Sequence, residues 1–458
     1  MSAGAPLPLP LPLLAAAAVA AALTFAGSRF RGVLAGPRDS ALYRLVVYAL
    51  GGQLALHLLL TGLGLAGVAW RLPAVAAALA AAAALAWRWL PAPADRTRLP
   101  SDLGWGEGLA LGACLLFTAF ALSLWIAIPD FVYHWGLKGH RFYLAGGVDY
   151  RYLAAPWNWV VHPDYPNLLP ELYAVTAMAA GRFDEPAMML WSAFCFALLL
   201  AAVREALRRT AAGGLVTQAA LAGIAMALAA YGIGNQSAGG ADWLIALALA
   251  AALPPLLSPV DRRGAAQIGV IAAFAAAAKV EGVALAAILI GIYAARAPWR
   301  RFKAEPGEAW RIAATLGLPA AAVILPWLGA VWRYHLFGAY NSGPLAPERA
   351  GRVLAAMLDS LQGSWWGFGY GLALLPLLAL DRRLRAVAAA LLLQLLFYLY
   401  VYLSVRFDPV PLVAASFPRL VMHLLPAALT GAAIALERPA GGARVPDDVS
   451  VEKVAAWG

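Results

Sequence analysis

The residues best suited to chemistry lie in one long polar stretch, residues 129–186, within an otherwise strongly apolar sequence. Asp130 directly follows an apolar segment and Pro129, so its carboxylate is expected where the apolar surroundings end. An ionisable group at such a boundary is costly unless it is used or paired. The carboxylate can act as a general base that takes the proton of an attacking hydroxyl. The alternative is an N-cap for a helix that begins at Phe131.

Basic residues follow in the same stretch. Lys138 and Arg141 are three positions apart, so on a helix they would share one face and suit a phosphate or pyrophosphate group. Contact with the phosphates of lipid headgroups is the alternative. Further on, two prolines make residues 162–166, His-Pro-Asp-Tyr-Pro, a rigid turn that is expected to hold its side chains in place.

Polar residues recur at the ends of three later apolar segments. Asp242 follows a polar, glycine-rich loop. Lys279 and Glu281 interrupt an apolar stretch, and because residues two positions apart on a helix do not face each other, they need other partners or a helix break. Arg419 opens the last apolar segment, either as a snorkelling anchor or as an anion ligand.

The composition is that of an integral membrane protein. The 458 residues are 63% hydrophobic and only 13% charged, with a mean hydropathy of +0.73, whereas soluble domains carry about 25% charged residues. The net charge of +10 comes from basic residues in short loops, where they set topology and meet lipid phosphates. Membrane lipids are therefore expected as partners, and nucleic acid is discarded. Cys114 and Cys195 fall within apolar segments, which argues against a disulfide framework or a thiolate metal site.

Apolar stretches of about 20 residues predict an all-α polytopic membrane protein with about thirteen transmembrane helices. Three of the segments, 72–87, 265–278 and 282–295, are short for a bilayer of about 30 Å, so the predicted count ranges from eleven to thirteen. The predicted spans are 7–26, 43–69, 72–87, 106–128, 187–207, 214–233, 242–258, 265–278, 282–295, 312–332, 365–380, 386–404 and 416–436.

The basic residues also predict the orientation. With the N-terminus outside, about two thirds of the 34 Lys and Arg residues fall on the cytoplasmic side, as the positive-inside rule requires. Residues 129–186 then form a long first outer loop, in which residues 131–144 and 168–180 are expected to be interfacial helices.

The order of these features resembles the GT-C superfamily of polytopic glycosyltransferases, especially its protein O-mannosyltransferase and lipid A aminoarabinose transferase branch. In that family an acidic residue after a transmembrane helix begins a long outer loop, as Asp130 does here. A second aspartate opens a later helix, as Asp242 does, and a lysine-glycine element and a proline-tryptophan pair follow, matched by residues 279–282 and 326–327. The family commonly has two adjacent acids at the first position, whereas Asp130 stands alone.

The resemblance implies a GT-C-like fold with a catalytic core at 106–335, flanked by transmembrane helices at 1–105 and 336–437 and followed by a cytoplasmic tail at 438–458. It also implies the reaction: transfer of a sugar, with inversion, from a polyprenyl-phosphate donor to a glycan, lipid or protein acceptor. The site would face the exterior or periplasmic side of the cytoplasmic (inner) membrane.

In that reaction Asp130 would be the general base. The residues expected to bind the donor phosphate are Lys138, Arg141, His162, Lys279 and Arg419. The residues expected to orient the substrates are Tyr133, His134, Asp164, Tyr165, Asp242 and Glu281. No cofactor and no metal is predicted, because no ligand spacing is diagnostic of one, although a divalent cation held by Asp130 with Asp164 or Asp242 would be chemically compatible.

The main alternative is a transporter or flippase for a lipid-linked saccharide, in which the same charges bind the ligand without chemistry. A transporter is expected to concentrate its polar residues near the bilayer midplane on interrupted helices. Here the polar residues cluster at the predicted outer ends of the apolar segments, which favours an enzyme.

Overall fold

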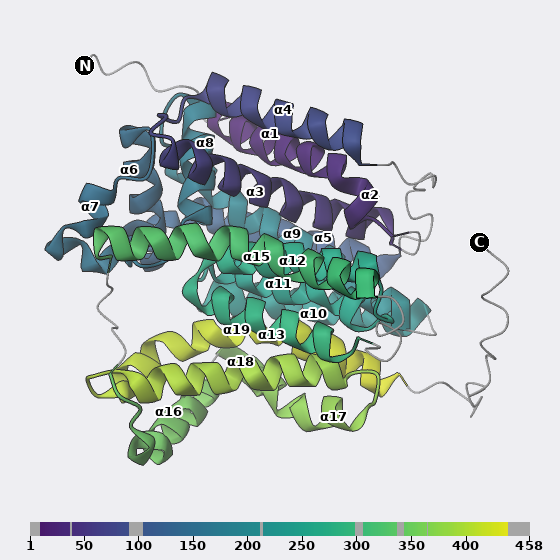
Figure 1. Cartoon of the computed structure of the whole chain (residues 1–458). Coiled ribbons are helices and arrows are strands. Elements are labelled where there is room, and N and C mark those ends of the chain that lie inside the picture. Colours follow the sequence, from purple (N-terminus) through teal and green to yellow (C-terminus); the bar gives the residue numbers. More distant parts are fainter. Residues whose placement is uncertain are drawn as a thin grey trace, which may run out of the picture.

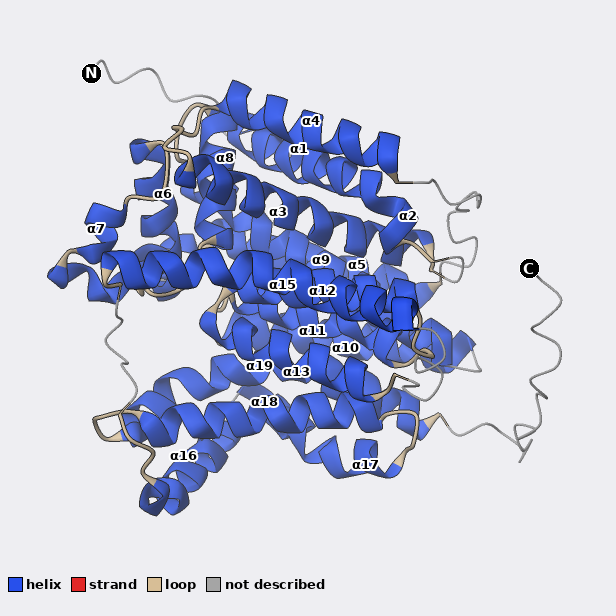
Figure 2. Ribbon diagram, viewed as in Figure 1, coloured by secondary structure: helices blue, strands red, loops and turns tan. Residues whose placement is uncertain are grey.

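The computed structural model is a bundle of long helices that run roughly side by side, with the short helices of residues 136–154 at one end (Figure 1). Within the described part of the chain the elements are helices joined by loops, and no strand occurs (Figure 2). The all-α prediction is therefore confirmed. The described residues are 10–36, 39–90, 104–210, 214–297, 306–336, 343–363 and 365–437. The predicted cytoplasmic tail, 438–458, lies outside them.

Nine of the described helices are long and apolar enough to cross a membrane. By length and composition the chain is therefore a multi-pass membrane protein. The nine are α1 (Pro10–Gly27, continued by α2, Arg31–Leu34), α3 (Ala41–Leu65), α4 (Leu72–Trp89), α5 (Trp105–Ser123), α9 (Glu185–Thr210), α10 (Gly214–Gly234), α15 (Pro306–Tyr334), α18 (Arg385–Ser404) and α19 (Pro409–Leu436).

The other four predicted spans form helices that are too short to be among these nine. Three of them are α11 (Asp242–Leu256), α12 (Arg262–Ala278) and α13 (Val280–Ala295), and the fourth is a 3-10 helix, η6 (Trp365–Leu374), that runs into α17 (Leu375–Leu380). Glycine at every second position from 367 to 371 disfavours an α-helix in η6. The count of thirteen crossings thus stays a prediction.

The centre of the bundle is α11, in which every residue from Asp242 to Leu256 is buried. Helices α9, α12 and α19 pack around it. Its alanine-rich sequence lets these neighbours approach closely, as small residues do in membrane helices. Asp242, the first residue of α11, is thereby held inside the protein.

Helices α12 and α13 are joined by the single residue Lys279, whose backbone is extended (φ −162°, ψ 159°). The two helices pack directly against each other. A Cβ atom on Gly282 would lie 1.9 Å from the carbonyl oxygen of Ala275, so only glycine permits this approach. The hairpin presents Lys279 at its tip.

The polar stretch at 129–186 contains five short elements: η3 (a π-helix, Phe131–Trp135), α6 (Gly136–Ala145), α7 (Tyr150–Ala154), η4 (Pro156–Val161) and α8 (Leu168–Ala180). The helix predicted at 131–144 is present as η3 and α6. The helix predicted at 168–180 is present as α8, but residues 168–177 are buried and α8 packs against α1, α3 and α6. It is enclosed by protein and is not interfacial, because most of its residues are apolar. An amphipathic helix that was not predicted, α16 (Ala350–Gly363), packs on α19.

Candidate functional site

Residues from distant parts of the sequence meet around one cavity of about 110 Å³. They come from the polar stretch at 129–186, from the α12–α13 turn and from α18 and α19. The described residues that line the cavity are Asp130, His134, Trp135, His162, Tyr165, Lys279, Glu281, Val401, Tyr402, Leu412, Ser416, Arg419 and Leu420. Seven of the twelve predicted site residues are therefore brought together here.

Asp130 and Arg419 form a direct ion pair between the carboxylate Oδ2 and the guanidinium Nη1. The Asp130 side chain makes no capping hydrogen bond, so it does not act as the N-cap considered from the sequence. Arg419 follows Pro418, whose carbonyl oxygen accepts a hydrogen bond from the Tyr231 hydroxyl at 2.6 Å. This bond connects α19 to α10 at the residue next to Arg419. Both charged side chains remain partly exposed, at 21% and 30%.

The helix breaks at Lys279, which is one of the two arrangements expected from its two-residue spacing to Glu281. Its Nζ lies 2.8 Å from Asp242 Oδ1 and 3.2 Å from Glu281 Oε1. Asp242 also contacts His423, whose Nε2 is 2.9 Å from the same oxygen. The other ring nitrogen of His423 lies 2.7 Å from the Tyr398 hydroxyl.

His423 and Tyr398 were not among the predicted site residues. Both are buried, at 0% and 1% exposure. A histidine within an apolar segment was a usable signal, because a polar group at that depth needs a partner. Tyr398 gave no such signal, since tyrosine is common in membrane helices.

The predicted turn at 162–166 lies against the cavity. His162 has a left-handed backbone (φ 49°), and its ring stacks on Tyr165 with centroids 4.5 Å apart. The ring of His134 lies 4.7 Å from that of His162. Burial lowers the pKa of His162 to about 2, and it lowers the pKa of His134 against the opposing effect of Asp130. At neutral pH both rings are therefore uncharged, and His162 can offer hydrogen bonds to a phosphate but no positive charge.

Lys138 and Arg141 do not share one binding face. Lys138 is 1% exposed, and its Nζ donates to the carbonyl oxygen of His162 at 2.9 Å. Arg141 points outward and pairs with Asp149 at 2.7 Å. Neither residue lines the cavity. Lys138 instead holds the turn at 162–166 in place.

Tyr133 and Asp164 also lie outside the cavity lining. Tyr133 is 59% exposed. The carbonyl oxygen of Asp164 accepts a hydrogen bond from Trp327 Nε1 at 3.0 Å, which fixes the turn against α15. Burial raises the pKa of the Asp164 carboxyl group.

Asp242 lies on the far side of the ion pair. It lines a separate cavity of about 290 Å³, together with residues 235–238, Asp130 and Arg419. Asp130 and Arg419 thus line both cavities.

Two polar atoms around the first cavity, His134 Nδ1 and Glu281 Oε2, are buried and form no hydrogen bond with the described residues. Burying such atoms costs free energy unless a water or ligand satisfies them. The site therefore offers a carboxylate base, two cations and unsatisfied hydrogen-bonding groups around one small space. Across the described ranges, no group of three or more His, Cys, Asp or Glu residues gathers as a metal site would require.

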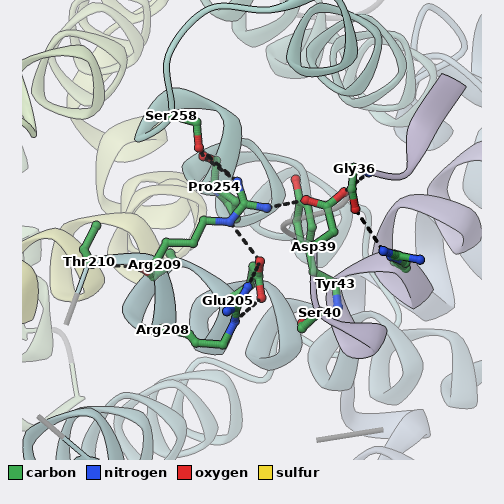
Figure 3. Close-up of polar contacts among 12 residues, drawn as sticks. Gly36, Asp39, Ser40, Tyr43, Glu205, Arg208, Arg209, Thr210, Pro254 and Ser258 are labelled. Carbon is green, nitrogen blue, oxygen red and sulfur yellow. Dashed lines mark hydrogen bonds and ion pairs between the residues drawn. The ribbon is translucent and has the colours of Figure 1, made fainter. Parts of the chain in front are cut away.

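A second polar cluster lies at the opposite end of the bundle, near α2. Figure 3 shows the Arg209 guanidinium between the carboxylates of Asp39 and Glu205, with Ser258 beside it. Glu205 also binds Arg208 at 2.8 Å. Because these charges satisfy one another, the cluster ties α9 to the start of α3 and to the end of α11.

A comparison with models of protein families, one with curated proteins and one with solved structures each found no match to this chain.

Proposed function

We propose that the chain is a glycosyltransferase that moves a sugar from a polyprenyl-phosphate donor to an acceptor hydroxyl at the outer face of the cytoplasmic membrane. The observation that carries the proposal is the convergence of Asp130, Arg419 and Lys279 on one cavity. Phosphate binding needs cations, and hydroxyl attack needs a base, and both are within this small space. The resemblance to the GT-C superfamily adds to the argument.

The proposed reaction is one displacement. The acceptor oxygen forms a bond to the anomeric carbon while the bond from that carbon to the phosphate oxygen breaks. The acceptor proton passes to the Asp130 carboxylate, and the electron pair leaves with the polyprenyl phosphate. Arg419 and Lys279 stabilise the negative charge that develops on the leaving phosphate.

The Asp130–Arg419 pair implies an order of events. Guanidinium groups bind phosphate through two parallel hydrogen bonds, so the donor phosphate competes with Asp130 for Arg419. Once Arg419 turns to the phosphate, Asp130 is available to the acceptor hydroxyl. Donor binding thus prepares the base.

Replacing Asp130 by Asn tests the proposal. Asparagine keeps the size of the side chain but cannot take the hydroxyl proton, so sugar transfer should fall by about 10² to 10⁴ with donor binding retained. The assay uses purified protein in nanodiscs, with a polyprenyl-phosphate sugar as donor and membrane glycolipid extract as acceptor. Asp149→Asn is the matched control, because Asp149 caps α7 outside the cavity and asparagine caps equally well.

The second candidate function is transport of a lipid-linked saccharide. The buried chain of Tyr398, His423, Asp242 and Lys279 favours it, because ionisable groups inside membrane proteins often mark transport pathways. A transporter would move the intact donor between leaflets. Near-normal sugar transfer by the Asp130→Asn variant would remove Asp130 from the role of general base. Movement of the intact donor between leaflets without cleavage would reject the enzyme in favour of the transporter.

A further inference from the structure

A cavity of about 300 Å³ lies beside the Asp130 cavity and shares Tyr165 with it. Its walls come from the end of α3, the start of α8, the end of α15 and the loop that follows α6. None of the residues predicted from the sequence as site residues, other than Tyr165, lines it. The ring of Tyr165 therefore forms a wall common to both spaces.

A buried acid and base form the floor of this second cavity. His57 Nδ1 lies 2.7 Å from Glu171 Oε2, and the two residues are 6% and 1% exposed. Placing both groups among helices is costly, so it is expected where they have a use. Nearby, Asn167 Oδ1 is buried and has no hydrogen-bond partner in the described structure. The cavity thus holds hydrogen-bonding groups of several types.

Aromatic rings supply the remaining walls. Tyr150 stacks on Tyr334 with centroids 4.1 Å apart and planes 6° from parallel. Trp327 and Trp70 also line the cavity. Flat aromatic faces beside a few fixed polar groups suit a ligand that has both C–H faces and hydroxyl groups.

The charge of the second cavity differs from that of the first. Among the described residues that line it there is no Lys or Arg, whereas Lys279 and Arg419 line the first cavity. The acidic residue Glu171 lies among the lining residues, in contact with His57. A phosphate or other anion would meet this acid and no Lys or Arg, so the ligand that fits is neutral.

We propose that this second cavity binds a neutral carbohydrate, with hydroxyl groups held by Glu171, His57 and Asn167 and sugar faces packed on Trp327 and Tyr334. Its identification as the acceptor rests on the proposed function. The acceptor then enters from the side of Tyr165 opposite the donor phosphate. The acceptor class is then a glycan or glycolipid.

The test measures carbohydrate binding without any transfer reaction. The full chain in nanodiscs is titrated with methyl β-glucopyranoside and, separately, with glucose 6-phosphate, and binding is followed by saturation-transfer NMR. The neutral glycoside should bind in the millimolar range at the second cavity, whereas the sugar phosphate is expected at the first cavity, where Lys279 and Arg419 lie. Glu171→Gln and Trp327→Leu should each weaken glycoside binding by about tenfold or more, because each removes a direct contact.

Trp332→Leu is the matched control, since Trp332 lies on the same helix but is 72% exposed. It should bind the glycoside as the wild type does. If the wild type binds no glycoside, or if Glu171→Gln and Trp327→Leu both bind the glycoside as tightly as the wild type, the carbohydrate site is rejected. The proposed transferase is tested separately, by the Asp130→Asn assay of sugar transfer. If that assay rejects the transferase while the glycoside still binds, the second cavity remains a saccharide-binding site.

Discussion

The Asp130–Arg419 contact shows how one pair of side chains can serve two purposes. Each charge offsets the cost of holding the other in a partly buried place, so the pair is stable without a ligand. In the proposed reaction, the same contact keeps the Asp130 carboxylate from the acceptor hydroxyl until an anion binds Arg419. A site built in this way would avoid exposing a free carboxylate to water near a reactive donor.

Lys138 is the residue whose role differs most from the sequence-based interpretation. It supports a turn from inside the protein, through its bond to the His162 carbonyl oxygen. Burial lowers its pKa to about 7, with Asp164 opposing this effect. In an unfolded chain the value is about 10.4.

Lys138→Met should therefore change how stability depends on pH. Between pH 7 and about 10.4, Lys138 is protonated in the unfolded wild type but not in the folded protein, so the free energy of unfolding rises with pH in this range. The cost of burying the charged Lys138 side chain is greatest below pH 7. The Met variant has no such cost, so its Tm relative to the wild type should be higher at pH 6 than at pH 9. Between pH 6 and pH 9, the free energy of unfolding of the variant relative to the wild type should change by on the order of 2 kcal/mol.

Thermal unfolding in detergent at pH 6 and pH 9 measures this effect. Arg141→Met is the control, because Arg141 is an exposed cation on the same helix. Its Tm difference from the wild type should be the same at both pH values. A Lys138→Met difference that is equally independent of pH would mean that Lys138 keeps its charge inside the protein.

At the scale of elements, the α12–α13 hairpin decides where Lys279 lies. The one-residue turn is possible only because Gly282 lets the two helices touch near Ala275. Gly282→Ala should lower the thermal stability by about 1 to 3 kcal/mol, since the new methyl group must push the helices apart. Sugar transfer should fall with it, because Lys279 would move away from Asp242.

Gly291→Ala is the matched control on the same helix. A Cβ at Gly291 meets no atom within 4 Å, and alanine favours a helix more than glycine does. Its Tm should equal or slightly exceed that of the wild type. If Gly282→Ala unfolds at the same temperature as Gly291→Ala, the close helix contact does not set the turn.

The helices were largely predictable, because a run of about 20 apolar residues leaves the backbone few alternatives to a helix in a membrane. Every predicted span overlaps a described helix. The 3-10 geometry of η6 was missed because hydropathy alone does not register alternating glycines. The helix α16 was missed because its polar residues hid an amphipathic pattern.

The site was predictable only in part. Residue types indicated Asp130, Lys279 and Arg419, but the pairing of Asp130 with Arg419 joins positions 289 apart. The pair of His57 and Glu171 spans 114 positions. Such contacts follow from how whole helices pack, and no local spacing encodes them. Burial of Lys138 likewise depends on α8 lying over α6.

The molecule as a whole has two unlike ends (Figure 1). At the end with α6 and α7, the two proposed ligand cavities have unsatisfied polar atoms and a charge pair that a ligand can break. At the end with α2, Asp39, Glu205 and Arg209 pair with one another (Figure 3), and Asp39 and Arg209 also line a cavity of about 380 Å³. The proposed function places its ligands at the end with α6 and α7, so it requires that end to face the outside.

The orientation that this requires can be measured by labelling exposed positions from one side. Arg151 in α7 and Arg262 at the start of α12 are both exposed and lie at opposite ends of the bundle. In a background with Cys114→Ala and Cys195→Ala, Arg151→Cys should react with a membrane-impermeant maleimide in intact cells, and Arg262→Cys only after permeabilisation. The positive-inside rule gives the reason, since the basic loops near Arg262 stay in the cytoplasm. The reverse pattern would turn both cavities toward the cytoplasm, where an acceptor on the outer face could not reach Asp130, and the proposed reaction would have to be abandoned in its present form.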